Sequence, residues 1–348
     1  MERKRSMKRS NKIQNVDLFT QAATEQYQKH IRTQSKQALQ RINEVVNWTL
    51  LLQPIEERLS SQKASASPVG RKPHDLLVIV KCMLLQKMYG LSDPRLEEEI
   101  ADRRSFQLFL GLTSGDSIPD ETAICRYRKL FAELKIDTMI FENFNKQLGR
   151  EGLIVGKGTI VDATLKEAQA TPGSGRDTDA SFTKRGSRTI YGYKGHIGVD
   201  VKTNVIHSVQ FTPANVHDSE KFEELLLSTE QVVYADKGYA KKKRTEQLQK
   251  KGIRCGILEK GYRNTPLTKA QKRRNKKLSA IRNRVEQPFA FFKQVLHYSR
   301  CRYYDLARNR LEFVLSAVVY NIRRMLSLNM KNTGVQRVIK QRTAPTIA

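Results

Sequence analysis

Cysteine is scarce in this sequence and is not arranged for metal binding or cross-linking. The four cysteines of the 348-residue chain are scattered, with no Cys-x-x-Cys pair among them. This spacing favours neither a zinc knuckle nor a disulfide framework. We therefore expect a reduced, cytoplasmic protein. The four residues are Cys82, Cys125, Cys255 and Cys301.

Long hydrophobic runs are also missing. No apolar stretch approaches the ~20 residues that a membrane-spanning helix needs. The basic segment 1–12 is not followed by the apolar core of a signal peptide. We expect neither secretion nor a membrane partner.

Acidic residues are the minority charge. The chain has 35 Asp and Glu residues against 63 Lys and Arg residues, which gives a formal net charge of +28. Such an excess of positive charge goes beyond what solubility requires and indicates a polyanionic partner. Nucleic acid fits this requirement best, and we expect a nucleoid-associated protein.

The first half of the chain has helical periodicity. A chain of this length has room for two domains, because single cores stop growing near ~250 to 300 residues. We expect a basic helical arm and linker over residues 1–72, with a helix over 39–59 that Pro54 kinks or interrupts. A helical domain for DNA binding or dimerisation should follow over 73–150. Its helices are predicted over residues 75–89, 93–109 and 121–134.

The helix predicted over residues 121–134 is a candidate recognition helix for DNA. Its apolar residues should face inward, while Arg126, Arg128 and Lys129 remain available outside. The preceding loop is long for a compact helix-turn-helix, so DNA contact and a structural role stay equally open. Trp48 is interpreted as a core residue rather than a base-stacking platform.

From about residue 153 the pattern changes to short runs of β-branched and apolar residues, which predict strands. The order predicts an α/β layered domain over residues 151–330, followed by a C-terminal tail over 331–348. The expected elements are a strand over 153–165, a loop over 171–187, a β-hairpin over 196–211, a helix over 218–227, a strand over 232–235, a helix over 242–250 and a strand over 254–258.

The segment 237–278 is the most basic part of the chain. We interpret it as a segment that contacts DNA phosphates, with a basic loop after the strand predicted over 254–258. A solvated loop is the alternative, since charge runs often remain in water, and the charge of the whole chain favours DNA. The candidate phosphate ligands are Lys272, Arg273, Arg274, Lys276 and Lys277.

Two carboxylates follow apolar strands. Asp162 lies near the end of the first predicted strand, and Asp236 directly follows the strand 232–235. If these strands are parallel neighbours, their spacing of ~4.8 Å sets the two carboxylates side by side. Such a pair repels, and a divalent cation relieves the repulsion.

A third acid has helical spacing relative to two cations. Arg282, Glu286 and Lys293 fall on one helix face over three turns. An adjacent apolar stripe should dock this helix on the sheet. Pro288 is expected to kink the helix or restart it. The stripe consists of Ile281, Val285, Phe289 and Phe292.

At these residues the chain resembles bacterial insertion-sequence transposases of the DDE class, in the branch with the signature Tyr-x2-Arg-x3-Glu-x6-Lys. Arg282, Glu286 and Lys293 match the spacing, whereas Ser279 stands where the family usually has Tyr. Further motifs of the resemblance lie at residues 161–164, 191–196, 215–219 and 235–239. The helical first half resembles the N-terminal domain of these proteins more weakly.

The resemblance implies an RNase H-like catalytic domain, with a mixed five-stranded sheet in which the first and fourth strands are adjacent. It implies that Asp162, Asp236 and Glu286 hold two Mg²⁺ ions, for which Mn²⁺ can substitute, and that Arg282 and Lys293 grip DNA phosphates. The implied activity is cleavage at the terminal inverted repeats and joining of the freed 3′-hydroxyl to target DNA. The implied assembly is a homodimer in the synaptic complex.

Several further polar residues have two interpretations. Lys194 and His196 precede one strand, and His217 and Asp218 precede the helix predicted over 218–227. Both pairs can contact phosphates or the metal edge, and both can be structural, with His217 and Asp218 acting as a turn and helix cap. Thr164 shares a strand face with Asp162 and can orient its carboxylate.

Two other classes of protein would use the same features. A domesticated DNA-binding protein retains the charge without catalysis, although the presence of all three acids speaks against decay. A structure-specific RNase H-like nuclease cuts DNA without joining it.

Overall fold

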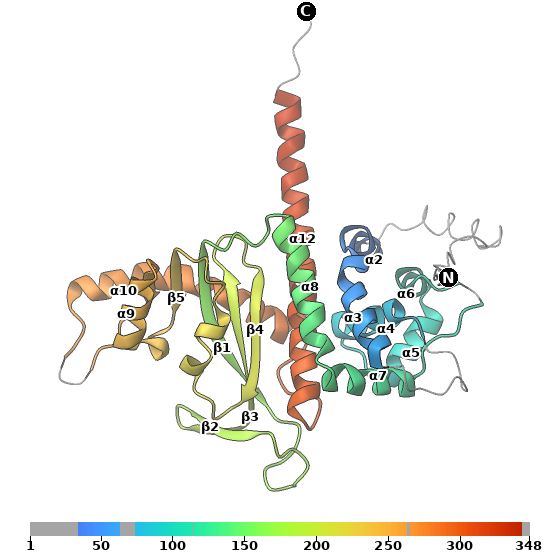
Figure 1. The fold of residues 1–348 in the computed structure, drawn as a ribbon, viewed down its shortest axis with the longest axis horizontal. Coiled ribbons are helices and arrows are strands. Elements are labelled where there is room, and N and C mark those ends of the chain that lie inside the picture. Colours follow the sequence, from blue (N-terminus) through green and yellow to red (C-terminus); the bar gives the residue numbers. More distant parts are fainter. Residues whose placement is uncertain (1–33, 63–73, 114, 263–264, 343–348) are drawn as a thin grey trace, which may run out of the picture.

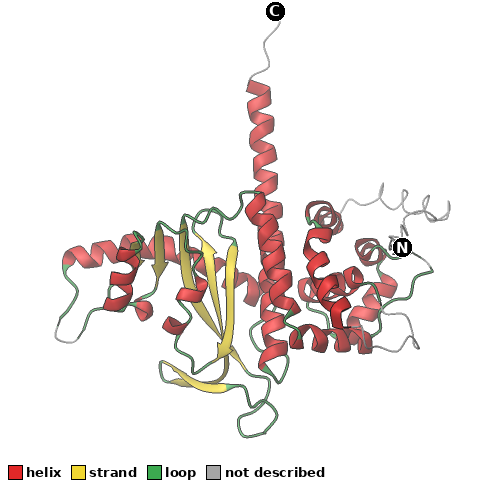
Figure 2. Cartoon of the chain, viewed as in Figure 1, coloured by secondary structure: helices red, strands yellow, loops and turns green. Residues whose placement is uncertain are grey.

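The computed structural model describes residues 34–62, 74–113, 115–262 and 265–342 (Figure 1). The basic segment 1–12 lies outside the described residues, and so do residues 63–72 of the predicted arm and linker. A helical part and a sheet lie on either side of two long helices, α8 and α12, and Figure 2 shows that all strands belong to one side.

The helical part follows the sequence signals closely. Helix α4 begins after Asp75, whose carboxylate accepts a hydrogen bond from Leu77 N, and ends at Gly90 in the left-handed conformation. Asp120 caps α7 in the same way through Ala123 N. The helices are α2 (Gln34–Val45), α3 (Trp48–Gln62), α4 (Leu76–Tyr89), α5 (Asp93–Asp102), α6 (Arg104–Leu110), α7 (Glu121–Glu133) and α8 (Ile136–Arg150).

Two predicted helices are divided differently from expectation. The helix predicted over 39–59 breaks at residues 46–47, where the Asn47 side chain accepts from Leu50 N, and Pro54 lies inside α3. The helix predicted over 93–109 is two helices, because Arg103 has extended backbone angles. Neither break was predicted, because neither contains the Pro or Gly that usually signals the end of a helix.

The sheet has the expected RNase H-like arrangement. Strand β1 (Gly158–Glu167) pairs antiparallel with β3 (Arg188–Asp200) and parallel with β5 (Val232–Ala235). Strand β4 (Ile206–Pro213) pairs with β3, and β6 (Arg254–Ile257) pairs parallel with β5. Within the described residues the sheet has six strands rather than the expected five, in the order β2-β3-β1-β5-β6, where β2 is Ser181–Arg185 and β4 also pairs with β3. Strands β1 and β5, which are the first and fourth predicted strands, are adjacent in space.

The structure corrects two elements of the catalytic half. The loop predicted over 171–187 contains β2 (Ser181–Arg185), which forms a hairpin with β3 across Gly186 and Ser187. Gly186 has a positive φ of 63°, as the first central position of a tight hairpin turn requires. The helix predicted over 218–227 consists only of two short 3₁₀ turns, η2 (Asp218–Glu220) and η3 (Glu223–Leu225).

The stretch after β6, which was predicted to be a basic loop, is largely helical. After α9 (Lys242–Lys250) and β6, helix α10 (Lys269–Arg282) begins with a capping box between Thr268 and Gln271. The 3₁₀ turn η5 (Asn283–Val285), helix α11 (Glu286–Ala290) and the π-helical turn η6 (Phe291–Val295) follow. Pro288 lies in the first turn of α11, where a missing N–H is tolerated, so the predicted restart of the helix is confirmed.

Helix α12 (Leu306–Arg342) joins the two parts of the molecule. It packs against α4, α7 and α8 on one side and against β4 on the other. One continuous apolar core includes residues of the helical part, of the sheet and of α12. Among the residues that the structure describes, no helix is both long and apolar enough to span a membrane.

Candidate active site

Asp162 and Asp236 lie side by side on neighbouring strands, as predicted. The β1–β5 register pairs Val161 with Ala235, and each aspartate is the next residue of its chain. Parallel neighbouring strands are ~4.8 Å apart. Asp162 lies in the middle of β1 rather than near its end, because β1 extends to Glu167. Asp236, in contrast, directly follows the carboxyl end of β5.

The two carboxylates belong to the sheet face that carries the third acid. Side chains alternate along a strand, so Asp162 shares the face of Ile160, and Asp236 shares that of Tyr234. Both apolar residues belong to the core that includes Val285 and Phe289, whereas Val161 and Ala235 pack in a second cluster with residues of α9. The predicted apolar stripe therefore docks its helix on the catalytic face, with Val285 fully buried just before Glu286.

Arg282 connects the acids across the helix break. Its Nη1 donates to Asp162 Oδ2 at 3.1 Å, and its Nη2 donates to Glu286 Oε1 at 3.3 Å. The Arg282 side chain is 18% exposed and that of Glu286 is 62% exposed. Arg282 thus supplies the positive charge between these carboxylates, which is a different contact from the predicted phosphate grip.

The environment of Asp162 opposes its negative charge. Burial raises the pKa of this carboxyl to about 6, and the charges of Asp236 and Asp218 raise it as well. A hydrogen bond from Ala163 N, at 2.9 Å, and the charge of Arg282 act in the opposite direction. A half-buried carboxylate next to a second one is a position that a cation stabilises.

The donor set fits a hard divalent metal. Carboxylate oxygens from Asp162, Asp236 and Glu286 are the ligands that Mg²⁺ and Mn²⁺ prefer. Within the described residues, however, no three His, Cys, Asp or Glu side chains are grouped closely enough to hold an ion. Glu286 is turned toward Arg282, so completing the site requires this side chain to move.

The predicted DNA ligands divide into exposed and structural residues. Lys272, Arg273, Lys276 and Lys277 are exposed on α10, Lys293 is exposed on η6, and Arg126 is exposed on α7. These six remain available to a partner. Arg274 is different, since it donates to Cys255 O at 2.7 Å and to Glu259 at 2.8 Å.

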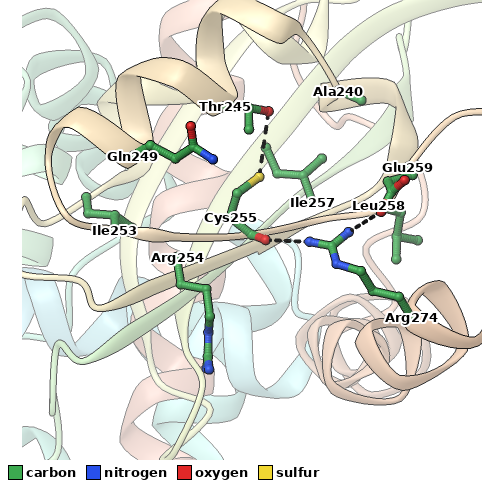
Figure 3. A pocket seen from close by; sticks show the side chains of 10 residues that line it. All are labelled: Ala240, Thr245, Gln249, Ile253, Arg254, Cys255, Ile257, Leu258, Glu259 and Arg274. Atoms are coloured by element: carbon green, nitrogen blue, oxygen red, sulfur yellow. Dashed lines mark hydrogen bonds and ion pairs between the residues drawn. The ribbon is translucent and has the colours of Figure 1, made fainter. Parts of the chain in front are cut away.

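Arg274 lines a cavity of about 460 Å³ between α9, β6 and α10 (Figure 3). The figure shows its guanidinium directed at the Cys255 carbonyl and at Glu259. None of the three candidate catalytic acids lines this cavity. Arg274 therefore ties α10 to the edge strand β6, and its predicted phosphate contact is replaced by a structural one.

Lys194 and Arg128 are also held inside the protein. Lys194 donates to Val216 O at 2.8 Å and pairs with Asp218 at 2.9 Å. Arg128, expected outside, is buried and binds Asp93 and Gln86. Neither set of contacts can be recognised in the local sequence. Asp218 lies 24 residues from Lys194, and the partners of Arg128 lie 35 and 42 residues from it.

The remaining polar candidates have structural contacts. His217 caps η2 by accepting from Ser219 N, which agrees with the cap interpretation. His196 is buried and contacts Thr212 Oγ1 at 3.0 Å. Thr164 shares the Asp162 face, but the described hydrogen bonds to Asp162 come from Ala163 and Arg282. Trp48 packs edge-on against Phe109, as expected of a core residue.

Sequence reasoning missed one residue that shapes the site. Arg244 lies within a basic run, yet it is buried, and it donates to Tyr239 O and Ser219 O, both at 2.6 Å. These bonds anchor the turn that follows Asp236 to the η2 segment. Nothing in the run Lys241 to Lys243 distinguishes this arginine from its solvated neighbours.

An RNase H-like sheet with carboxylates side by side on neighbouring strands and a third acid on a docked helix is typical of a class of nucleic-acid enzymes. The comparisons agree. The model of the transposase DDE domain matches residues 155–322, and that of a transposase domain (DUF772) matches residues 26–130. Both models describe transposase domains and together match more than half of the chain, which carries a transposase DDE domain over residues 155–322.

A solved structure provides a distant comparison. The cryo-EM structure of a piggyBac transposase synaptic complex with hairpin DNA is 10% identical, with 88% of this chain and 80% of that chain covered and a TM-score of 0.42. This similarity is too low to support an argument about geometry or mechanism.

Proposed function

We propose that this protein is an insertion-sequence transposase that cuts DNA at transposon ends and joins the freed 3′-hydroxyl to target DNA. The observation that carries the proposal is the β1–β5 register, which sets Asp162 beside Asp236 on the face where Glu286 docks. The match to a transposase DDE domain supports the same assignment.

Asp162, Asp236 and Glu286 would hold two Mg²⁺ ions, or Mn²⁺ in their place. A bound pair of this kind activates the attacking oxygen and stabilises the leaving oxygen. The contribution of the protein is to fix the carboxylates and to orient the DNA strand. Val285 and Phe289 fix the helix that carries Glu286, and Arg244 fixes the turn after Asp236.

Arg282 and Lys293 follow the Arg-x3-Glu-x6-Lys spacing of the signature branch. Arg282 would release the carboxylates when metal binds and then contact a phosphate beside the scissile bond. Lys293 is already exposed and would contact the DNA backbone directly. Ser279, in place of the usual Tyr, supplies a hydroxyl without a ring.

The division of labour along the chain follows from these roles. Residues 151–330 would form the catalytic domain, with the basic segment 237–278 binding DNA phosphates. Residues 73–150 would bind transposon ends or dimerise, with Arg126 on the exposed face of α7. The arm 1–72 and the tail 331–348 would flank these domains. A homodimer would hold the two terminal inverted repeats in the synaptic complex.

The test uses the complete chain with duplexes that carry the terminal inverted repeats, identified in the DNA that flanks the gene. With Mg²⁺ and a supercoiled target plasmid, the proposal predicts cleaved ends and joined products. Bound ends without cleavage would indicate a domesticated DNA-binding protein. Cleaved ends without joined products, under all metal conditions, would indicate a nuclease.

A further inference from the structure

The β2–β3 hairpin carries an aromatic pair, Phe182 and Tyr191, of which Phe182 is exposed. The hairpin extends past one end of the sheet, away from α9 and α10 (Figure 1). Phe182 is 56% exposed, although most large apolar side chains in the described residues are buried. Its ring centroid lies 4.9 Å from that of Tyr191, at an interplanar angle of 48°. Tyr191 is partly buried and packs against the core, whereas the exposed ring of Phe182 is available to a partner.

The pair is held rigidly. Phe182 and Tyr191 are directly opposite each other in the β2–β3 register, which continues over five residue pairs. The Tyr191 hydroxyl donates to Asp177 O at 2.6 Å, which fixes the ring from behind. A preorganised aromatic platform loses little conformational entropy on binding.

Positive charge surrounds the aromatic pair. Lys184 is exposed and lies two residues beyond Phe182, on the same face of β2. Arg188, at the start of β3, is 72% exposed and pairs with Glu167 at 2.8 Å. It lies three residues before Tyr191, so it is on the opposite face of the hairpin. Arg176 is exposed on the preceding loop.

The platform shares a sheet face with the catalytic carboxylates. Asp162 is opposite Ile197 on β3, and Tyr191 lies six residues before Ile197. Residues an even number of positions apart lie on the same face of a strand, so Tyr191 shares the face of Ile197. A rise of ~3.4 Å per residue places Tyr191 ~20 Å along the sheet from the level of Asp162. This is the length of about six nucleotides of one DNA strand.

We propose that the β2–β3 hairpin is a binding site for unpaired DNA bases, with one base stacked on Phe182 and a flanking phosphate bound by Lys184. The site rests on the proposed function, and it engages the DNA strand about six nucleotides from the bond that is cut. The chemistry is that of single-strand binding, in which aromatic faces stack on bases and cations follow the backbone. The charge of Lys184 and the net charge of +28 favour DNA over a second copy of this strongly basic chain as the occupant.

The test measures binding of a labelled 20-nucleotide single strand and of a blunt 20-base-pair duplex, at several salt concentrations without added metal. Phe182→Ala should weaken single-strand binding about tenfold and change duplex binding less than twofold. Phe182→Leu, which keeps an apolar side chain on the hairpin, should show the same loss. Tyr304→Ala, which removes another exposed ring, is the matched control and should bind both DNAs as the parent does.

Two further measurements separate the outcomes. Lys184→Gln should flatten the salt dependence of single-strand binding by about 0.7. A 2-aminopurine base in the strand should be quenched by the parent and not by Phe182→Leu. If both Phe182 variants bind and quench like the parent, the pair only stabilises the hairpin and the proposal is wrong. A loss of dimerisation in these variants, with single-strand binding intact, would assign the hairpin to chain–chain contact instead.

Single-strand binding by the hairpin is measured independently of the proposed catalysis. Asp236→Asn should leave hairpin binding intact, so failure of the hairpin does not affect the catalytic assignment. Conversely, normal stacking in a protein that joins no DNA would support the hairpin and contradict the transposase activity.

Discussion

Arg282 lies between Asp162 and Glu286 and donates to both, at 3.1 and 3.3 Å. One guanidinium thus neutralises a strand carboxylate and a helix carboxylate at once. In the proposed mechanism a metal ion would need the same oxygens, so arginine and metal would compete for Asp162 and Glu286. Loading of the site would then release Arg282 toward DNA.

This competition predicts the effect of Arg282→Gln on metal affinity. The variant should bind Mn²⁺ about fivefold more tightly in the absence of DNA, because a pair contributing about 1 kcal/mol no longer holds the carboxylates. Titration calorimetry on the complete chain measures this directly, with Arg284→Gln as a control from the same segment. Weaker Mn²⁺ binding in Arg282→Gln would mean that the arginine organises the ligands instead.

Lys293→Ala should separate DNA positioning from metal binding. Lys293 is exposed and remains free to contact a phosphate, so its loss should reduce strand transfer by about tenfold, the equivalent of ~1.4 kcal/mol. Mn²⁺ affinity should not change. Strand transfer at the parent rate would show that η6 turns this side chain away from the DNA.

The exposed cations of α10 should contribute a salt-dependent part of DNA binding. Replacing Lys272, Arg273, Lys276 and Lys277 by Gln should weaken binding to all sequences alike and flatten the slope of log affinity against log salt by up to ~0.9 per contact. Arg274→Gln should behave differently. It should lower the melting temperature, because it breaks the bond to Cys255 O. An unchanged slope in the variant with all four replacements would mean that these α10 cations are only solvated and do not contact DNA.

Buried histidines should make stability depend on pH. Burial lowers the pKa of His207 to about 4 and that of His196 to about 4. The unfolded chain binds these protons near pH 6.5, so the stability present above that pH is lost as the pH falls toward 4. Each histidine should cost about 2 kcal/mol of unfolding free energy by pH 5. Urea unfolding at pH 7.5 and pH 5 measures the loss, and His207→Gln should reduce it. An equal loss in parent and variant would contradict this cause.

The sequence predicts the parts of this fold whose signals are local. The acids near apolar strands, the Asx caps and the apolar stripe at helical spacing correctly predicted that Asp162 lies beside Asp236 and that the helix of Glu286 docks on the sheet. Asp162 was placed near the end of its strand and lies in the middle of β1. The Gly186-Ser187 turn between β2 and β3 was equally local and was overlooked in a polar segment.

Charged residues were less predictable, because their roles depend on partners distant in the chain. Arg128, Arg244 and Arg274 each lie in a basic helix and resemble solvated cations in the sequence. Tertiary structure pairs them with Asp93, backbone carbonyls and Glu259. A buried cation needs such partners, but no local pattern identifies them.

The most direct test of the account is single-turnover cleavage of a transposon end by Asp162→Asn, Asp236→Asn and Glu286→Gln, with DNA binding measured on the same preparations. The account predicts that each variant loses cleavage with Mg²⁺ and with Mn²⁺ while it binds DNA nearly as the parent does. Glu167→Gln, on the same strand as Asp162, should cut normally. Full cleavage by any of the three variants would remove that residue from the site and contradict the assignment.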